Sequence, residues 1–185
     1  YNKKYCRDPR FCSIRSLIKT GDLYGAEFCY ITIPYELDLF DCKAYLENPM
    51  EFYVVCTDVE TGKPLYRKCI TGSDEDLTWI RASASMPIAS RVVAATDYKL
   101  LDGGISDSIP LKYFESIGYN KNVVILTQPE GYVKKPSKAL PLIKATLKEY
   151  PNVYKTMLNR HNDDNTSLKQ IEEGEKAGNV LVIRP

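Results

Sequence analysis

Histidine is almost absent from the sequence: the 185 residues include one, His161. A metal site built from several histidines is therefore impossible within this chain, and a Ser-His-Asp triad could use only His161. That residue lies in the polar stretch Asn159–Asp164, where a lone histidine is more often a surface group than a catalytic one.

Excess charge and long apolar runs are also lacking. The 25 Lys and Arg residues nearly balance the 24 Asp and Glu residues, which argues against a general nucleic-acid binder. No apolar run approaches the roughly 20 residues that a membrane-spanning helix needs. The first ten residues, from Tyr1, show no signal-peptide pattern, although a targeting segment could lie upstream. We expect a cytoplasmic protein, with no nucleic-acid partner and with an undetermined oligomeric state.

The cysteines lack the spacing of a metal or redox motif. No CxxC pair occurs and no cysteine follows position 69. A chain of this length also has little need of disulfides to stabilise its core. We therefore favour reduced thiols, with disulfides and then zinc as the alternatives. The six residues are Cys6, Cys12, Cys29, Cys42, Cys56 and Cys69.

The hydrophobic pattern predicts alternating strands and helices. The predicted strands are 51–57, 65–70, 98–101, 122–127 and 179–183, the first two forming a hairpin around the turn at 61–64. The run at 122–127 is continuously apolar, which is typical of a buried parallel strand. The predicted helices are 74–85, 108–118, 136–150, 151–159 and 166–178, with a further short helix beginning near 13. The alternation indicates an α/β fold, a layered and partly parallel sheet flanked by helices.

One turn stands out as a candidate site. Asp102, Gly103 and Gly104 directly follow the strand predicted at 98–101. An aspartate at a strand end lies where open α/β sheets keep their active sites, and two glycines permit a sharp turn and a close approach by another group. Its carboxylate could act as a general base, or it could merely cap a tight turn.

The surroundings of this turn resemble a known family. Arg81–Pro87 (RASASMP) and Leu100–Leu111 (LLDGGISDSIPL) resemble the second half of the patatin-like phospholipase domain, with the bacterial branch closest. The resemblance extends to 57–62, 122–129 and 180–185, and so covers about residues 50–185. It implies a serine acyl hydrolase with a Ser–Asp dyad and no catalytic histidine, in which Asp102 is the aspartate.

The sequence departs from that family at a decisive point. It contains neither the G-x-S-x-G of the nucleophile nor a glycine-rich oxyanion loop, and in the family both precede the segment present here. We interpret residues 1–185 as the C-terminal part of one such domain. The resemblance then implies a lipid or lysolipid ester as substrate, no metal or organic cofactor, and a chain that is inactive alone. Four serines could in principle substitute for the nucleophile, but none has the context of a nucleophile elbow: Ser83, Ser85, Ser106 and Ser108.

Two alternatives stay open. The chain could be a non-catalytic binding or scaffold relative whose Asp-Gly-Gly turn is purely structural. Asp58 and Glu60, spaced as in the D-x-D loop of aspartate-nucleophile phosphatases, could instead indicate Mg²⁺-dependent chemistry, although Gly62-Lys63-Pro64 looks like a hairpin turn.

A lysine-rich stretch favours peripheral contact with a membrane surface, or else is simply a solvated helix face. It lacks an acidic residue until Glu149 and comprises Lys134, Lys135, Lys138, Lys144 and Lys148.

Overall fold

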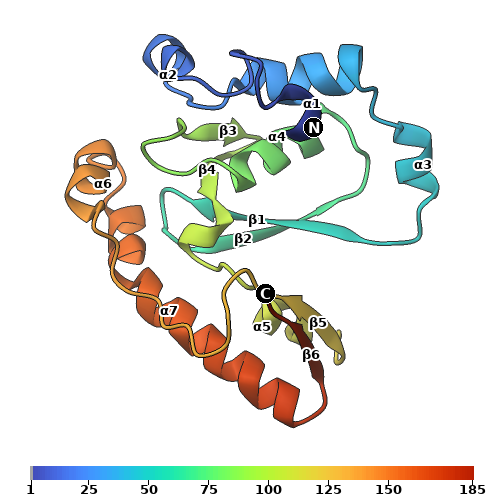
Figure 1. Ribbon diagram of the computed structural model, residues 1–185, viewed down its shortest axis with the longest axis vertical. Coiled ribbons are helices and arrows are strands. Elements are labelled where there is room, and N and C mark those ends of the chain that lie inside the picture. Colours follow the sequence, from blue (N-terminus) through green and yellow to red (C-terminus); the bar gives the residue numbers. More distant parts are fainter. Residues whose placement is uncertain (1) are drawn as a thin grey trace.

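Two separate β-sheets organise the chain in a computed structural model that describes residues 2–185 (Figure 1). The larger has the order β2-β1-β4-β3 and is entirely antiparallel. The smaller pairs β5 with β6 in parallel. The chain is thus mixed α/β, but the single partly parallel sheet expected from the sequence is divided in two. The strands are β1 Phe52–Asp58, β2 Pro64–Cys69, β3 Val93–Ala95, β4 Tyr98–Asp102, β5 Asn122–Ile125 and β6 Val180–Ile183.

Nine helical segments surround these sheets within residues 2–185: α1 Asn2–Tyr5, α2 Ile14–Thr20, η1 Phe28–Leu37, α3 Cys42–Glu47, α4 Asp74–Ser83, η2 Gly103–Ile105, α5 Leu111–Ser116, α6 Leu140–Thr146 and α7 Pro151–Lys176. The predicted short helix near residue 13 is confirmed as α2, whose first turn is capped by the Ser13 hydroxyl. The π-helix η1 and helix α3 have no counterpart in the prediction. None of the helices in the described residues is long and apolar enough to span a membrane.

Helices cover both faces of the larger sheet. On one face, Trp79 and Ala82 of α4 pack against Cys56 and Leu100. On the other, Leu101 joins a second core with α6 and the first turns of α7, where Val153 and Met157 are buried. All six cysteines are free in the structure, and Cys56 and Cys69 are buried among apolar side chains.

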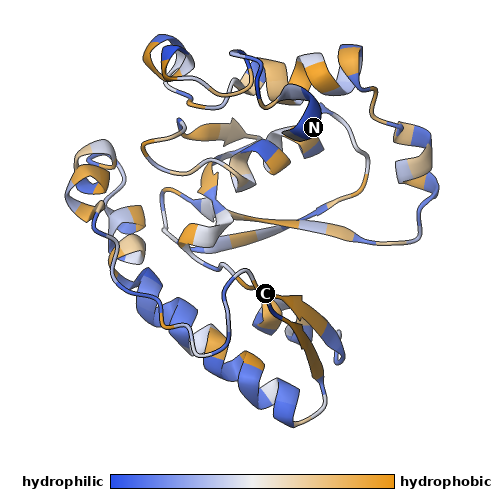
Figure 2. Ribbon diagram, viewed as in Figure 1, coloured by the Kyte–Doolittle hydropathy of each residue, from blue (hydrophilic) through white to orange (hydrophobic). Residues whose placement is uncertain are grey.

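The smaller sheet is covered on one face only. Val124 and Val180 point into a core with Leu111 of α5 and Ile171 of α7. The opposite face carries the register-paired, exposed side chains of Val123 with Leu181 and of Ile125 with Ile183, and both strands are strongly hydrophobic in Figure 2. The prediction of parallel pairing is confirmed, whereas the prediction that 122–127 is a fully buried strand is wrong.

The C-terminal helices differ from the prediction. Residues 151–176 form one continuous helix, α7, where two helices separated by the polar stretch at 160–165 are expected, and α6 is shorter than the predicted 136–150. The buried residues of α7 explain the difference: Val153, Met157, Asp164 and Ile171 recur on one face. Asp164 takes a position on this buried face where the helical period expects an apolar residue. The apolar pattern of the sequence is therefore interrupted there, although the helix continues.

Candidate functional site

Asp102 is the last residue of β4, as the sequence predicts, and directly precedes the 3₁₀ turn η2. Its backbone is fixed from both sides: its N–H donates to the Ser85 carbonyl over 2.9 Å, and its carbonyl accepts from Thr57 Oγ1 over 2.8 Å. Its side chain accepts from the Gly104 N–H over 2.7 Å through Oδ1. Among the residues described, no group donates to Oδ2, so this oxygen is left for an additional donor.

Gly103 is required by close packing. A methyl group built on it would lie 2.2 Å from the Val55 carbonyl oxygen on the neighbouring strand β1. The same construction on Gly104 gives 3.0 Å to Asp102 Oδ1 and 3.4 Å to Arg160 Nη2. The first glycine therefore allows the turn to lie against the sheet, and the second keeps space open beside the carboxylate.

The electrostatic environment of Asp102 has two opposing parts. Burial raises the pKa of the Asp102 carboxyl above its ordinary value, because the charged form is poorly solvated there. The Gly104 N–H and the positive charge of Arg160 on α7 lower the same pKa. Desolvation is the larger effect, so the site favours a carboxylate that accepts a proton more readily than an exposed one would.

A polar cluster around the buried side chain of Asp164 lies beside the turn and was not predicted. Asp164 on α7 accepts from Ser108 Oγ over 2.9 Å and forms an ion pair with Lys134, while Arg160 Nε lies 4.0 Å from the same carboxylate. Ser108 Oγ also lies 3.0 Å from the Gly104 carbonyl oxygen, which links the cluster to the Asp-Gly-Gly turn. The contacts of Asp164 with Ser108 and Lys134 join residues 56 and 30 positions apart, so no local sequence pattern could indicate them.

None of the four serines bonds to the Asp102 carboxylate in the part of the chain that the structure describes. Ser106 Oγ lies 2.7 Å from Thr57 Oγ1, and Ser85 Oγ donates to the Arg81 carbonyl. The helix predicted over 108–118 begins only at Leu111, so Ser108 does not cap it and turns toward Asp164 instead.

Arg81 finds its carboxylate partner far away in the sequence. Its Nη2 lies 3.4 Å from Asp22 Oδ2, and Arg91 reaches the same oxygen at 2.9 Å. Asp22 is 3% exposed, so these two cations hold the segment before η1 against the end of α4. The small residues Ala84 and Ser85 line an adjoining cavity of about 310 Å³.

The phosphatase-like spacing is accounted for by the β1–β2 hairpin. Asp58 Oδ1 accepts from the Glu60 N–H and Oδ2 accepts from Thr61 Oγ1, over 3.1 and 2.7 Å. Gly62 completes the turn with a φ of +70°. The hairpin tip also packs on α7, where Thr156 donates to the Gly62 carbonyl. Both oxygens of Asp58 thus serve the turn, as a structural role predicts.

The lysine-rich stretch is not one continuous face. Lys134 is paired with Asp164, and Lys144 lies over the Tyr154 ring at 5.8 Å, while Lys135, Lys138 and Lys148 are exposed. His161 is half-buried within α7, in the turn after Arg160.

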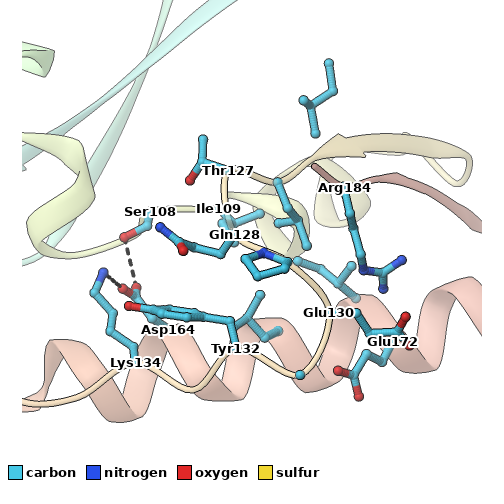
Figure 3. Close-up of a pocket in the computed structure, with 16 residues that line it drawn as sticks. Ser108, Ile109, Thr127, Gln128, Glu130, Tyr132, Lys134, Asp164, Glu172 and Arg184 are labelled. Atoms are coloured by element: carbon cyan, nitrogen blue, oxygen red, sulfur yellow. Dashed lines mark hydrogen bonds and ion pairs between the residues drawn. The ribbon is translucent and has the colours of Figure 1, made fainter.

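A cavity of about 210 Å³ opens next to the polar cluster around Asp164 (Figure 3). It lies between α7 and the loop that follows β5, with Arg184 just after β6 at its other end. Ser108, Lys134 and Asp164 converge at one side of it, joined by a hydrogen bond and an ion pair. The cavity thus lies outside the carboxyl ends of both parallel strands, where open α/β sheets bind their ligands.

Replacing Arg160 with glutamine is expected to raise the pKa of Asp102 further, because the variant removes the positive charge that lowers it. A carboxyl-carbon NMR titration of Asp102 measures the shift directly. Lys155→Gln is the matched control, because it also removes one positive charge, at an exposed position on the same helix. It should leave the pKa of Asp102 unchanged. An equal shift in both variants would mean that Arg160 has no specific effect.

No protein-family model matches the chain, and no curated protein matches it either.

Proposed function

We propose that this chain is the aspartate-bearing, C-terminal part of a patatin-like acyl hydrolase that cleaves a carboxylic ester of a lipid or lysolipid. One observation carries the proposal. The Asp102 carboxylate stands at the end of a strand, partly desolvated, oriented by the Gly104 N–H and with Oδ2 open to another donor. The resemblance of the surrounding residues to the family supports the choice of reaction.

The geometry suits the work of a general base. A serine hydroxyl supplied from outside this segment would donate to Asp102 Oδ2, and the carboxylate would take its proton as the serine oxygen attacks the ester carbonyl carbon. The proton then passes to the departing alcohol oxygen as the ester bond breaks. In the second half, water attacks the acyl-serine carbonyl carbon and gives a proton to Asp102. The bond between the acyl group and the serine oxygen then breaks, the serine oxygen takes the proton back from Asp102, and the carboxylic acid leaves. These steps require no metal or organic cofactor.

The remaining parts of the reaction need groups that the sequence lacks. The transition-state oxyanion requires preorganised donors, and a donor of this kind contributes about 3–4 kcal/mol in comparable enzymes. Without them and without the nucleophile, the 185-residue chain should not hydrolyse esters. Contact with a membrane surface through the exposed lysines of 135–148 belongs to the same proposal.

Labelling with a fluorophosphonate probe tests the missing nucleophile. We expect the 185-residue chain to show no stoichiometric labelling, while a longer protein that includes the upstream segment is labelled at one serine. The longer protein with that serine replaced by alanine is the control. Stoichiometric labelling of the chain itself, for example at Ser106 or Ser108, would refute the proposal. A longer protein that is equally unreactive would favour a non-catalytic module.

A further inference from the structure

The cavity beside the polar cluster has a predominantly apolar floor. Ile109 and Leu126 line it from the two connecting loops, and Leu168 and Ile171 line it from α7. Ile125, at its edge, belongs to the exposed apolar face of the smaller sheet, so the cavity continues outward along Val123, Leu181 and Ile183. Hydrocarbon inside it would therefore meet apolar side chains on the floor and toward Ile125, while Thr127 and Gln128 form a polar part of the rim.

Both cations that line the cavity are paired with carboxylates of the protein, and Glu130 and Glu172 add further negative charge to the lining. Lys134 is paired with Asp164, and Arg184 makes two hydrogen bonds to the Glu175 carboxylate, at 3.0 and 2.7 Å. Neither cation is left for an anionic headgroup. The pairing of both cations and the two additional carboxylates disfavour a phosphate as the occupant, because a phosphate would have to displace Asp164 or Glu175 from its cation.

The loop that closes the cavity is held firmly against α7. Asn165 bonds to both backbone groups of Lys134: Oδ1 accepts from the N–H over 2.8 Å and Nδ2 donates to the carbonyl over 3.0 Å. Lys134 is thus held through its backbone by Asn165 and through its side chain by Asp164, and these contacts keep the loop in place without a ligand. The cavity is therefore preformed, which lowers the entropic cost of binding.

The Asp102 carboxylate and Ser108 of the cavity wall border the same space, because a methyl group built on Gly104 would lie 3.0 Å from Asp102 Oδ1 and 3.7 Å from Ser108 Oγ. Ser108 Oγ contacts the Gly104 carbonyl at one end and Asp164 in the cavity wall at the other. The cavity lined by Ala84 and Ser85 meets Asp102 through its backbone N–H instead. A chain bound here could thus place its polar end near the open oxygen of Asp102.

We infer that this cavity is the acyl-chain subsite, which takes a short linear hydrocarbon segment of the ester substrate. Its identity as an acyl subsite depends on the proposed function, whereas its binding of hydrocarbon does not. The volume of about 210 Å³ equals about seven liquid waters at roughly 30 Å³ each, enough for a short alkyl segment and too little for two acyl chains. A longer chain would extend over Ile125 and the exposed sheet face.

Methyl NMR titration of the 185-residue chain with 1-octanol tests the site. We expect saturable shifts of the Leu126, Leu168 and Ile171 methyl groups. Leu168→Trp, which fills the cavity, should weaken binding at least tenfold. Leu158→Trp, on the same helix but outside the cavity, should leave it unchanged. Thr127→Trp provides a second blocking variant. Because Thr127 is exposed at the rim of the cavity, this substitution does not disturb the packed core.

Methyl chemical shifts that do not saturate would overturn the assignment of the cavity as a hydrocarbon-binding site. Equal octanol affinity in the blocking and control variants would overturn it as well. Its role is tested in the longer protein, where Leu168→Trp should lower kcat/KM for octanoyl esters at least tenfold relative to acetyl esters. An unchanged ratio overturns the acyl subsite even when hydrolysis requires Asp102. If octanol binds but Asp102→Asn leaves the rate of hydrolysis unchanged, the proposed function is overturned and only the hydrocarbon-binding cavity remains.

Discussion

Replacing Asp102 with asparagine is expected to lower kcat for ester hydrolysis about a thousandfold in a longer protein that carries the proposed serine, within the range that a positioned general base contributes. Asparagine keeps Oδ1 as an acceptor for the Gly104 N–H, so the turn retains its hydrogen bond. It cannot take the serine proton. The loss should therefore appear in kcat rather than in KM, and steady-state kinetics with a short-chain ester would show it.

The control for this variant is Asp97→Asn, which removes a carboxylate from the exposed turn of the same β3–β4 hairpin and should leave kcat unchanged. Hydrolysis that survives Asp102→Asn nearly unchanged would remove Asp102 from the mechanism, whatever the fold.

Unfolding should not account for the loss, and the sign of the pKa shift shows why. Burial raises the pKa of Asp102 in the folded state, so the folded protein binds this proton more tightly than the unfolded chain does. Stability then falls as pH rises from the ordinary aspartate pKa through the raised one, and stays lower at neutral pH. Asparagine removes that loss. Urea denaturation at pH 7 should find the variant at least as stable as the native chain.

Gly103→Ala is expected to destabilise the fold by about 3 kcal/mol, at the upper end of the cost of overpacking. The added methyl group would lie 2.2 Å from the Val55 carbonyl oxygen and 2.7 Å from Val55 Cβ, both in the central strand β1. That strand bonds to β2 and β4, so it has little freedom to move away. Urea denaturation monitored by the single tryptophan, Trp79, would report the change.

Gly104→Ala is the matched comparison. Its methyl group would lie 3.0 Å from Asp102 Oδ1 and 3.4 Å from Arg160 Nη2, which are the ends of side chains that can shift. We expect a cost of about 1 kcal/mol or less, together with a larger effect on catalysis in the longer protein, because those side chains form the proposed site. Equal destabilisation by the two variants would contradict the distinct roles assigned to the glycines.

Local patterns predicted those elements whose determinants lie close together in the sequence. The β1–β2 hairpin follows from two apolar runs around the turn at Thr61–Pro64, and α4 follows from the acidic residues of its first turn and from Pro87 beyond its end. The position of Asp102 at a strand end is confirmed for the same reason. Parallel pairing of β5 with β6 was also indicated, because continuous apolar runs are typical of such strands.

Features that depend on distant partners could not be predicted. The antiparallel pairing of β1 with β4 joins Cys56 to Asp102, a separation that no short pattern encodes. Asp164 is a polar residue on the buried face of α7 and so interrupts its apolar pattern. Its partners there, Ser108 and Lys134, come from other segments, so the sequence around Asp164 does not show that it is buried. The same polar cluster is the wall of the proposed acyl subsite, so the sequence pointed to Asp102 but not to the cavity beside it.

The coding sequence immediately upstream of Tyr1 tests most directly the claim that this chain carries one half of a Ser–Asp dyad. We predict an open reading frame of about half a further domain, with a glycine-rich loop followed by G-x-S-x-G. A start codon directly before Tyr1, or an upstream segment without that serine, would contradict the account, because Asp102 would then have no nucleophile to activate.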